Sequence, residues 1–142
     1  MATATEKKVS VNLTPIVTGG VVVAVALALY LLYRWNKNRD ANKYLKTTNK
    51  EIIKSQLSFQ DTDYSNMANA LLGAMKGLGT DEDTIYSVFN RMETESDVRK
   101  LVASFGLQNG KTLQQWLLSE LSKTEQAKLN ALLETKGINY TF

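Results

Sequence analysis

The sequence contains neither cysteine nor histidine, and Pro15 is the one proline among its 142 residues. Without cysteine there are no disulfide bonds and no thiolate ligands. Without histidine there is no imidazole for a zinc site or for acid–base catalysis. The acidic residues also form no pair on an apolar background that would suit an acid–base dyad. These absences argue against catalysis, so we predict a protein that is not an enzyme.

Charge is missing from one long segment. From Ser10 to Tyr33 there is no charged residue, and residues 15–33 are dominated by Val, Ala, Leu and Gly. About 20 apolar residues at a rise of about 1.5 Å each cross a hydrocarbon layer about 30 Å thick. A buried core helix and a cleaved signal peptide are the alternatives, but the segment is too long for the first and lacks the flanking pattern of the second. We therefore predict a transmembrane helix over residues 14–35.

Aromatic and basic residues close this segment, as is typical of a membrane–water interface. The expected interface residues are Tyr33, Arg34, Trp35, Lys37 and Arg39. Residues 34–50 hold six basic residues and one acidic residue, a net charge of +5. Residues 51–142 hold nine basic and twelve acidic residues, a net charge of −3. By the positive-inside rule, we expect the C-terminal part on the cytoplasmic side.

The basic collar at residues 34–50 is expected to contact anionic lipid headgroups of the bilayer. Nucleic acid is not expected as a partner, because no pattern of aromatic stacking residues or glycine-rich loops interleaves the collar. Small residues recur at every fourth position of the apolar segment, at Gly20, Ala24 and Ala28. Such spacing permits close contact between helices, so a homo-oligomer formed through this face is a further hypothesis.

Composition divides the chain into four parts: a polar N-terminus at 1–13, the predicted membrane helix at 14–35, a polar helical stalk and linker at 36–60, and a helical domain at 61–142. In the last part, apolar residues recur with a helical period in five stretches. Potential capping residues precede four of these stretches, each followed at i+3 by Asp, Glu or Gln: Thr80, Thr94, Thr112 and Ser122. We therefore predict an all-α chain that ends in a compact five-helix bundle.

Two motifs in this domain resemble one repeat of the annexin family. The stretch Met75-Lys-Gly-Leu-Gly-Thr-Asp-Glu-Asp-Thr-Ile85 is similar to the first inter-helix loop of an annexin repeat. The stretch Leu117-Leu-Ser-Glu-Leu121 is similar to the segment that follows the fourth helix core. The apolar stretches between them fall in the same order, so the resemblance covers residues 64–135.

The resemblance implies an annexin-like bundle with a calcium site in its first loop. The backbone carbonyls of Met75, Gly77 and Gly79 would be ligands, together with the carboxylate of Glu120. Calcium prefers hard oxygen ligands, and glycine lets the backbone turn its carbonyls inward. The alternative is that Gly77 and Gly79 only end one helix while Thr80 caps the next. Calcium is the one cofactor that the resemblance suggests.

These features predict a non-enzymatic, membrane-anchored structural or adaptor protein of a large membrane-associated assembly. A lone repeat would need protein partners to cover its apolar flank. One setting is a virus particle in which a minor membrane protein links the membrane to the capsid, and a bacterial membrane complex fits nearly as well. The alternatives are a calcium-dependent phospholipid-binding module and a holin-like lysis protein.

Overall fold

A computed structural model of the chain describes residues 14–142, with side chains from residue 22 onward. Over this range the chain is all-α, with six α-helices, a short 3-10 helix and no strand; a single β-bridge joins Gln108 and Lys111. The described residues divide into two compact units, with the boundary between Asn36 and Lys37. The predicted all-helical class is confirmed, whereas the polar N-terminus predicted at 1–13 lies outside the described residues.

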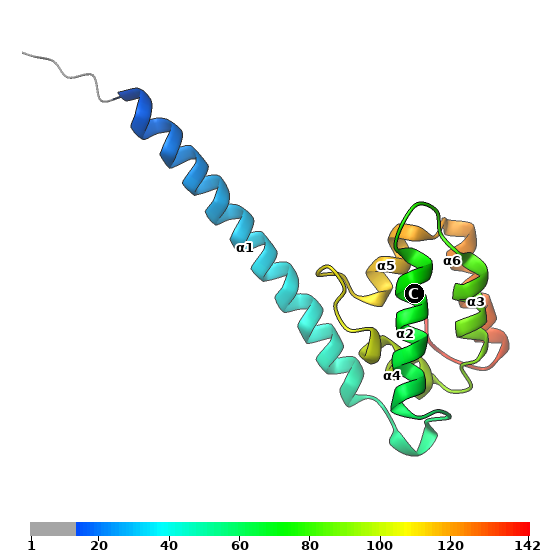
Figure 1. Ribbon diagram of the computed structural model, residues 1–142. Coiled ribbons are helices and arrows are strands. Elements are labelled where there is room, and N and C mark those ends of the chain that lie inside the picture. Colours follow the sequence, from blue (N-terminus) through cyan, green and yellow to red (C-terminus); the bar gives the residue numbers. More distant parts are fainter. Residues whose placement is uncertain (1–13) are drawn as a thin grey trace, which may run out of the picture. The chain divides into compact units, whose positions relative to one another are not determined.

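Helix α1 (Thr14–Lys50) is the longest element, with 37 residues (Figure 1). No helix in the described part of the chain is both long and apolar enough to cross a membrane. This corrects the prediction of a transmembrane helix over residues 14–35. From Arg34 onward α1 is polar and charged.

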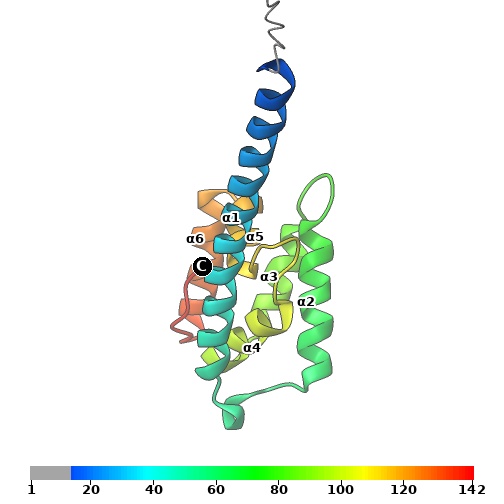
Figure 2. The ribbon, with the colours of Figure 1, turned by 90° about the vertical axis from the view of Figure 1, so that its left-hand side faces the viewer.

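The second unit contains the five helices that the apolar periodicity predicted: α2 (Asp61–Met75), α3 (Glu82–Asn90), α4 (Glu95–Phe105), α5 (Leu113–Glu120) and α6 (Lys123–Thr135). Helix α2 packs against α3 and α4, α6 packs against α3, and α5 contacts both α2 and α4 (Figure 2). Their apolar faces meet in one core, whose fully buried side chains include Leu71, Phe89, Leu101, Leu117 and Leu129. The predicted helical bundle is therefore present.

The helix starts follow the capping signals in the sequence, with one shift. Thr94, Thr112 and Ser122 each accept a hydrogen bond from the backbone amide three residues later, and each forms a complete capping box. At α3 the cap is Asp81 instead of Thr80, because the Asp81 carboxylate accepts a 2.9 Å hydrogen bond from the amide of Thr84. Helices α3, α4, α5 and α6 therefore each begin where a polar side chain accepts a hydrogen bond from one of the free amide groups of the first turn.

The C-terminal part of α1 belongs to the same unit as the bundle. Ala41 and Thr48 are buried there, and the hydroxyl groups of Tyr44 and Tyr140 lie 2.7 Å apart in a hydrogen bond. Beyond α1, the amide of Ile53 donates to the hydroxyl oxygen of Ser96 at 3.1 Å. The short 3-10 helix η1 (Lys54–Gln56) also packs on α4. Residues 37–57 thus contribute contacts to the compact unit.

Candidate functional site

Apolar side chains of α1 form a continuous exposed surface in the unit that ends at Asn36. We call residues 22–33 the apolar segment. Its large side chains have exposed fractions from 52% at Val25 to 68% at Val22. They are Val22, Val23, Val25, Leu27, Leu29, Tyr30, Leu31, Leu32 and Tyr33. Large exposed apolar patches often mark sites of contact with a membrane or with another protein, so the apolar segment is a candidate site.

The predicted interface residues follow directly on the apolar segment. Tyr33, Arg34 and Trp35 are exposed at the end of the first unit, as is Arg39 in the second unit. Lys37 is half-buried, and it lines a small pocket with residues from the start of α5. Aromatic and basic side chains therefore follow the apolar ones in the order that suits a membrane–water interface. Their contact with lipid stays a prediction.

The predicted helix-association face is only partly described. Ala24 and Ala28 are exposed and stand four residues apart, so they share one face of α1. The surroundings of Gly20 lie outside the residues with described side chains. Small exposed residues on one face permit close approach of a second helix but do not require it. The association of copies through Gly20, Ala24 and Ala28 stays a prediction.

The loop between α2 and α3 depends on its two glycines. Gly77 has a φ of 138° and Gly79 a φ of 84°, a region of backbone conformation that favours glycine. The loop is closed by a 3.0 Å hydrogen bond from the amide of Asp81 to the carbonyl of Ala74. Between the glycines, the side chain of Leu78 is fully exposed. This geometry is that of a helix stop followed by a helix cap, which was one of the two hypotheses drawn from the sequence.

The structure does bring this loop next to Glu120. The Thr80 hydroxyl lies 3.4 Å from a carboxylate oxygen of Glu120, across 40 positions of sequence. Among the predicted ligands, the side chain of Met75 is buried in the core, whereas Gly77 and Gly79 are exposed. The described residues contain no group of three or more acidic side chains placed to hold a metal ion. Calcium binding at Met75, Gly77, Gly79 and Glu120 stays a prediction.

The buried side chain of Asp97 is the centre of a hydrogen-bond network. The sequence predicted its place in the capping box with Thr94 but not its contacts with other residues outside α4. Its carboxylate is fully buried and accepts five hydrogen bonds. Two come from the amide and hydroxyl of Ser58, both at 2.8 Å, and one from the hydroxyl of Tyr64. The amides of Glu93 and Thr94 donate the others, at 3.1 and 3.0 Å. The carboxylate is thus occupied by structural donors and is closed to a substrate.

The ionisation of this buried pair follows from the same contacts. Burial by itself would raise the pKa of Asp97, but the hydrogen bonds from Tyr64 and Ser58 stabilise the carboxylate, and the net effect lowers its pKa below the usual value. Burial raises the pKa of the Tyr64 hydroxyl, and the hydrogen bond to Asp97 raises it further. Asp97 is therefore charged and Tyr64 neutral near neutral pH, a stable pairing and not a poised acid and base.

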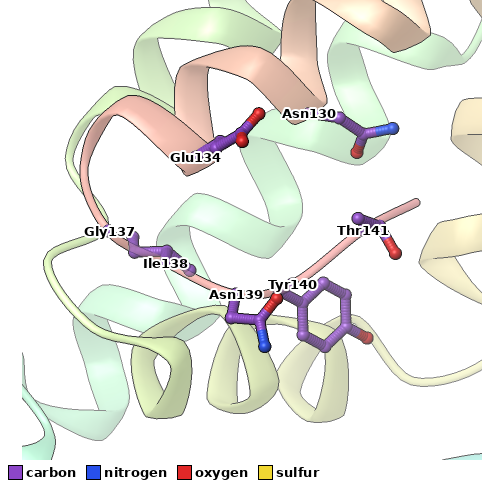
Figure 3. Close-up of a pocket in the computed structure, with 7 residues that line it drawn as sticks. All are labelled: Asn130, Glu134, Gly137, Ile138, Asn139, Tyr140 and Thr141. Carbon is purple, nitrogen blue, oxygen red and sulfur yellow. The ribbon is translucent and has the colours of Figure 1, made fainter.

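A pocket of about 400 Å³ lies between the end of α6 and the C-terminal tail (Figure 3). Asn130 fastens this tail, because its side chain donates to the carbonyl of Phe142 at 3.2 Å and accepts from the amide of Phe142 at 2.9 Å. The ionisable groups of the pocket are Glu134 and Tyr140. Burial raises the pKa of Tyr140, and its hydroxyl is bonded to Tyr44. The pocket therefore has no activated nucleophile with a neighbouring base.

No family model, curated protein or solved structure matches this chain. The resemblance of residues 64–135 to an annexin repeat behind a transmembrane helix is therefore corrected: no family match supports the repeat, and no membrane-crossing helix is found in the described residues. The structure supplies the local reason. The glycine-rich stretch ends α2 and the acidic residues after it start α3, a combination that serves any tight junction between two helices.

Proposed function

We propose that this chain is a non-enzymatic structural or adaptor protein that is attached to a membrane by the apolar segment of α1. In this proposal, the helical bundle is presented to protein partners in a larger membrane-associated assembly. The observation that carries the proposal is the exposure of residues 22–33, whose large side chains are at least half accessible. Lipid acyl chains would remove this surface from water, at a gain of about 25 cal/mol per Å².

The charge pattern beside the segment supports the same proposal. Arg34 follows Tyr33 directly, and the net charge of +5 over residues 34–50 suits the anionic lipids of a cytoplasmic leaflet. We therefore place the bundle on the cytoplasmic side. A particle that contains a membrane beneath a protein shell is one assembly in which such a protein would link the two layers.

The adaptor role is supported by the chemistry of the bundle. The carboxylate of its buried acid, Asp97, accepts hydrogen bonds from structural donors only. In the C-terminal pocket, the hydroxyl of Tyr140 is hydrogen-bonded to the hydroxyl of Tyr44 and not to a basic group. The sequence has no histidine or cysteine to replace them. A small helical bundle with capped helices and one continuous core is suited to rigid presentation of a surface.

Membrane attachment is tested by fractionation of cells that produce the full chain. We expect the protein in the membrane pellet, resistant to both 1 M salt and alkaline carbonate, because apolar contacts are insensitive to salt. Replacing Val25 and Leu29 by glutamate should move most of the protein out of the pellet. The matched control replaces the exposed polar residues Asn42 and Asn49 of the same helix by glutamate and should stay in the pellet.

Release of the wild-type protein by carbonate would contradict the proposal. A defined soluble oligomer that dissociates in the Val25→Glu, Leu29→Glu variant would show that other copies cover the apolar segment instead of lipid. Recovery of the control variant in the soluble fraction would show that added charge anywhere on α1 releases the protein, and would remove the support that the double variant gives.

A second candidate function is calcium-dependent contact with phospholipid. It is favoured by the 3.4 Å approach of the Thr80 hydroxyl to a carboxylate oxygen of Glu120, which brings this acid to the end of the loop that contains Gly77 and Gly79. It ranks lower because one carboxylate supplies little charge for calcium. The neighbouring carboxylate of Asp81 is already used as the cap of α3. A calcium titration separates the two functions and is described with the other predictions below.

A further inference from the structure

One face of α1 in the second unit carries a line of positive charge. Lys43, Lys46 and Lys50 are all exposed and follow one another at intervals of three and four residues, which places them on one face of a helix. We call these three residues the basic ridge. Arg39 precedes Lys43 by four residues, so it continues the same line. At a rise of about 1.5 Å per residue, the ridge extends about 10 Å along the helix and successive charges are about 4.5 to 6 Å apart.

The ridge faces away from the bundle. The positions on the other side of this part of α1 are occupied by the buried side chains of Ala41 and Thr48 and by Tyr44, which is bonded to Tyr140. Among the described residues, the recorded ion pairs involve Arg99 and Lys100, and none includes a lysine of the ridge. The three lysines are therefore exposed to solvent along one face of the helix, and the opposite face is packed against the bundle.

The composition of the ridge favours a phosphate polymer over a protein surface. Protein interfaces have an apolar centre and are depleted in lysine. The exposed neighbours of the ridge are instead polar, namely Asn42, Thr47 and Asn49, with the acidic residues Asp40 and Glu51 at its two ends. An interfacial helix on a bilayer would need apolar residues beside its charges, and those of this segment are packed against the bundle. A row of cations with hydrogen-bonding neighbours fits a linear polyanion best.

We propose that the basic ridge of α1 binds the phosphate backbone of a nucleic acid duplex, without reading its sequence. Duplex DNA carries about one charge per 1.7 Å of its axis, so a line of three lysines meets several phosphates at once. Phosphate contacts require no stacked side chains. We expected no nucleic-acid partner because a pattern of stacking side chains is missing. That absence argues against binding to the bases of a single strand, but it does not argue against contact with the phosphate backbone of a duplex. Lys43, Lys46 and Lys50 supply three of the charges of residues 34–50 that the proposed function assigns to anionic lipid, and here they contact nucleic acid in its place.

The test measures the affinity of the full chain, kept in a neutral detergent, for a fluorescent 30-base-pair duplex of arbitrary sequence. We expect log K to fall with log salt concentration with a slope of about −3, because each contacted phosphate contributes about −0.9. Replacing Lys43, Lys46 and Lys50 by glutamine should weaken binding at least about tenfold at 0.1 M salt and bring the slope close to zero. The affinity should not differ between duplexes of unrelated sequence.

The matched control replaces three exposed lysines that lie on other elements, Lys76, Lys123 and Lys136, by glutamine. It removes the same net charge and should keep most of the slope. Equal loss in the control and the ridge variant would overturn the proposal, because net charge alone would explain binding. Displacement of the duplex by polyglutamate at equal charge would overturn it in favour of an acidic protein. The proposal would also be overturned if the full chain preferred phosphatidylserine vesicles to the duplex, and the ridge variant lost its affinity for the vesicles but kept its affinity for the duplex.

Discussion

The hydroxyl group of Tyr64 on α2 donates a hydrogen bond to the carboxylate of Asp97 on α4, 33 positions later, and both side chains are completely buried. The same carboxylate holds Ser58, which precedes α2. The carboxylate of Asp97 therefore connects three segments: the residues that precede α2, the first turn of α2 and the first turn of α4. The stability of the bundle should depend strongly on this group.

We expect Asp97→Asn to lower the free energy of unfolding by about 3 kcal/mol. The amide group of asparagine carries hydrogens, so it would oppose backbone amides that now donate to the carboxylate and leave buried donors unsatisfied. Urea denaturation of the full chain in neutral detergent measures the change. Asp83→Asn removes an exposed carboxylate and should cost less than about 1 kcal/mol. Equal effects of the two substitutions would show that Asp97 has no special role.

The lowered pKa of Asp97 predicts a loss of stability in acid. A group whose pKa is lower in the folded state stabilises the fold above its unfolded pKa, about 3.9 for Asp, and this contribution is lost as the pH falls through the folded pKa. The difference in free energy of unfolding between wild type and Asp97→Asn should therefore be constant near neutral pH and shrink below about pH 4. A difference that shrinks instead between pH 6 and pH 8 would assign the effect to another group.

Trp116 should contribute to the core as strongly as its burial suggests. Its side chain is 8% exposed, and its indole N–H donates to the carbonyl of Gln108 at 3.0 Å. Trp116→Ala should lower the free energy of unfolding by about 3–5 kcal/mol, because it leaves a large cavity. Leu118→Ala changes an exposed residue of the same helix and should cost far less. A loss below about 1 kcal/mol for Trp116→Ala would show that the ring is not part of the core.

Calcium should have little effect on thermal stability. We expect no shift of the melting temperature at micromolar calcium and at most a small one at millimolar calcium, because Glu120 alone supplies little negative charge. Glu120→Gln should behave as the wild type does, and so should Glu134→Gln, which changes an exposed carboxylate elsewhere. A large shift at micromolar calcium that only Glu120→Gln abolishes would make calcium-dependent lipid binding the first choice.

The proposed attachment predicts the side of the membrane on which the bundle lies. Protease added to intact cells should spare residues 37–142, because we propose that the +5 charge at residues 34–50 holds this part of the chain at the anionic cytoplasmic leaflet. The same protease should digest the protein once the membrane is permeabilised. Digestion in intact cells would reverse the orientation while leaving attachment itself untouched.

Local signals carried most of what could be predicted about the fold. The bundle helices follow the spacing of apolar residues, and Thr94, Thr112 and Ser122 cap their helices because such caps are made within four residues of sequence. The shift from Thr80 to Asp81 at α3 shows the limit of these signals. Two adjacent residues both suit the position, and only the path of the loop, which turns Thr80 toward Glu120, decides between them.

The features that the sequence could not predict depend on contacts between residues far apart in the chain. The Thr94–Asp97 capping box was visible, but the approach of Ser58 and Tyr64 to the same carboxylate depends on how α2 packs against α4. The polar residues after Arg34 suggested a stalk, whereas Ala41 and Thr48 are buried against the bundle. The resemblance to an annexin loop failed for a related reason, since a helix stop and a helix cap produce the same few residues wherever two helices meet closely.

The hydrogen bond between Tyr44 and Tyr140 joins positions 96 residues apart, and Phe142 packs its ring edge-on against Phe89 beside it. During synthesis, α1 leaves the ribosome long before the tail does. Residues 37–50 must therefore wait for nearly the whole chain before this contact can close, while the apolar residues ahead of them are already available to a membrane. Under the proposed membrane attachment, the order of synthesis thus favours attachment first and completion of the bundle second.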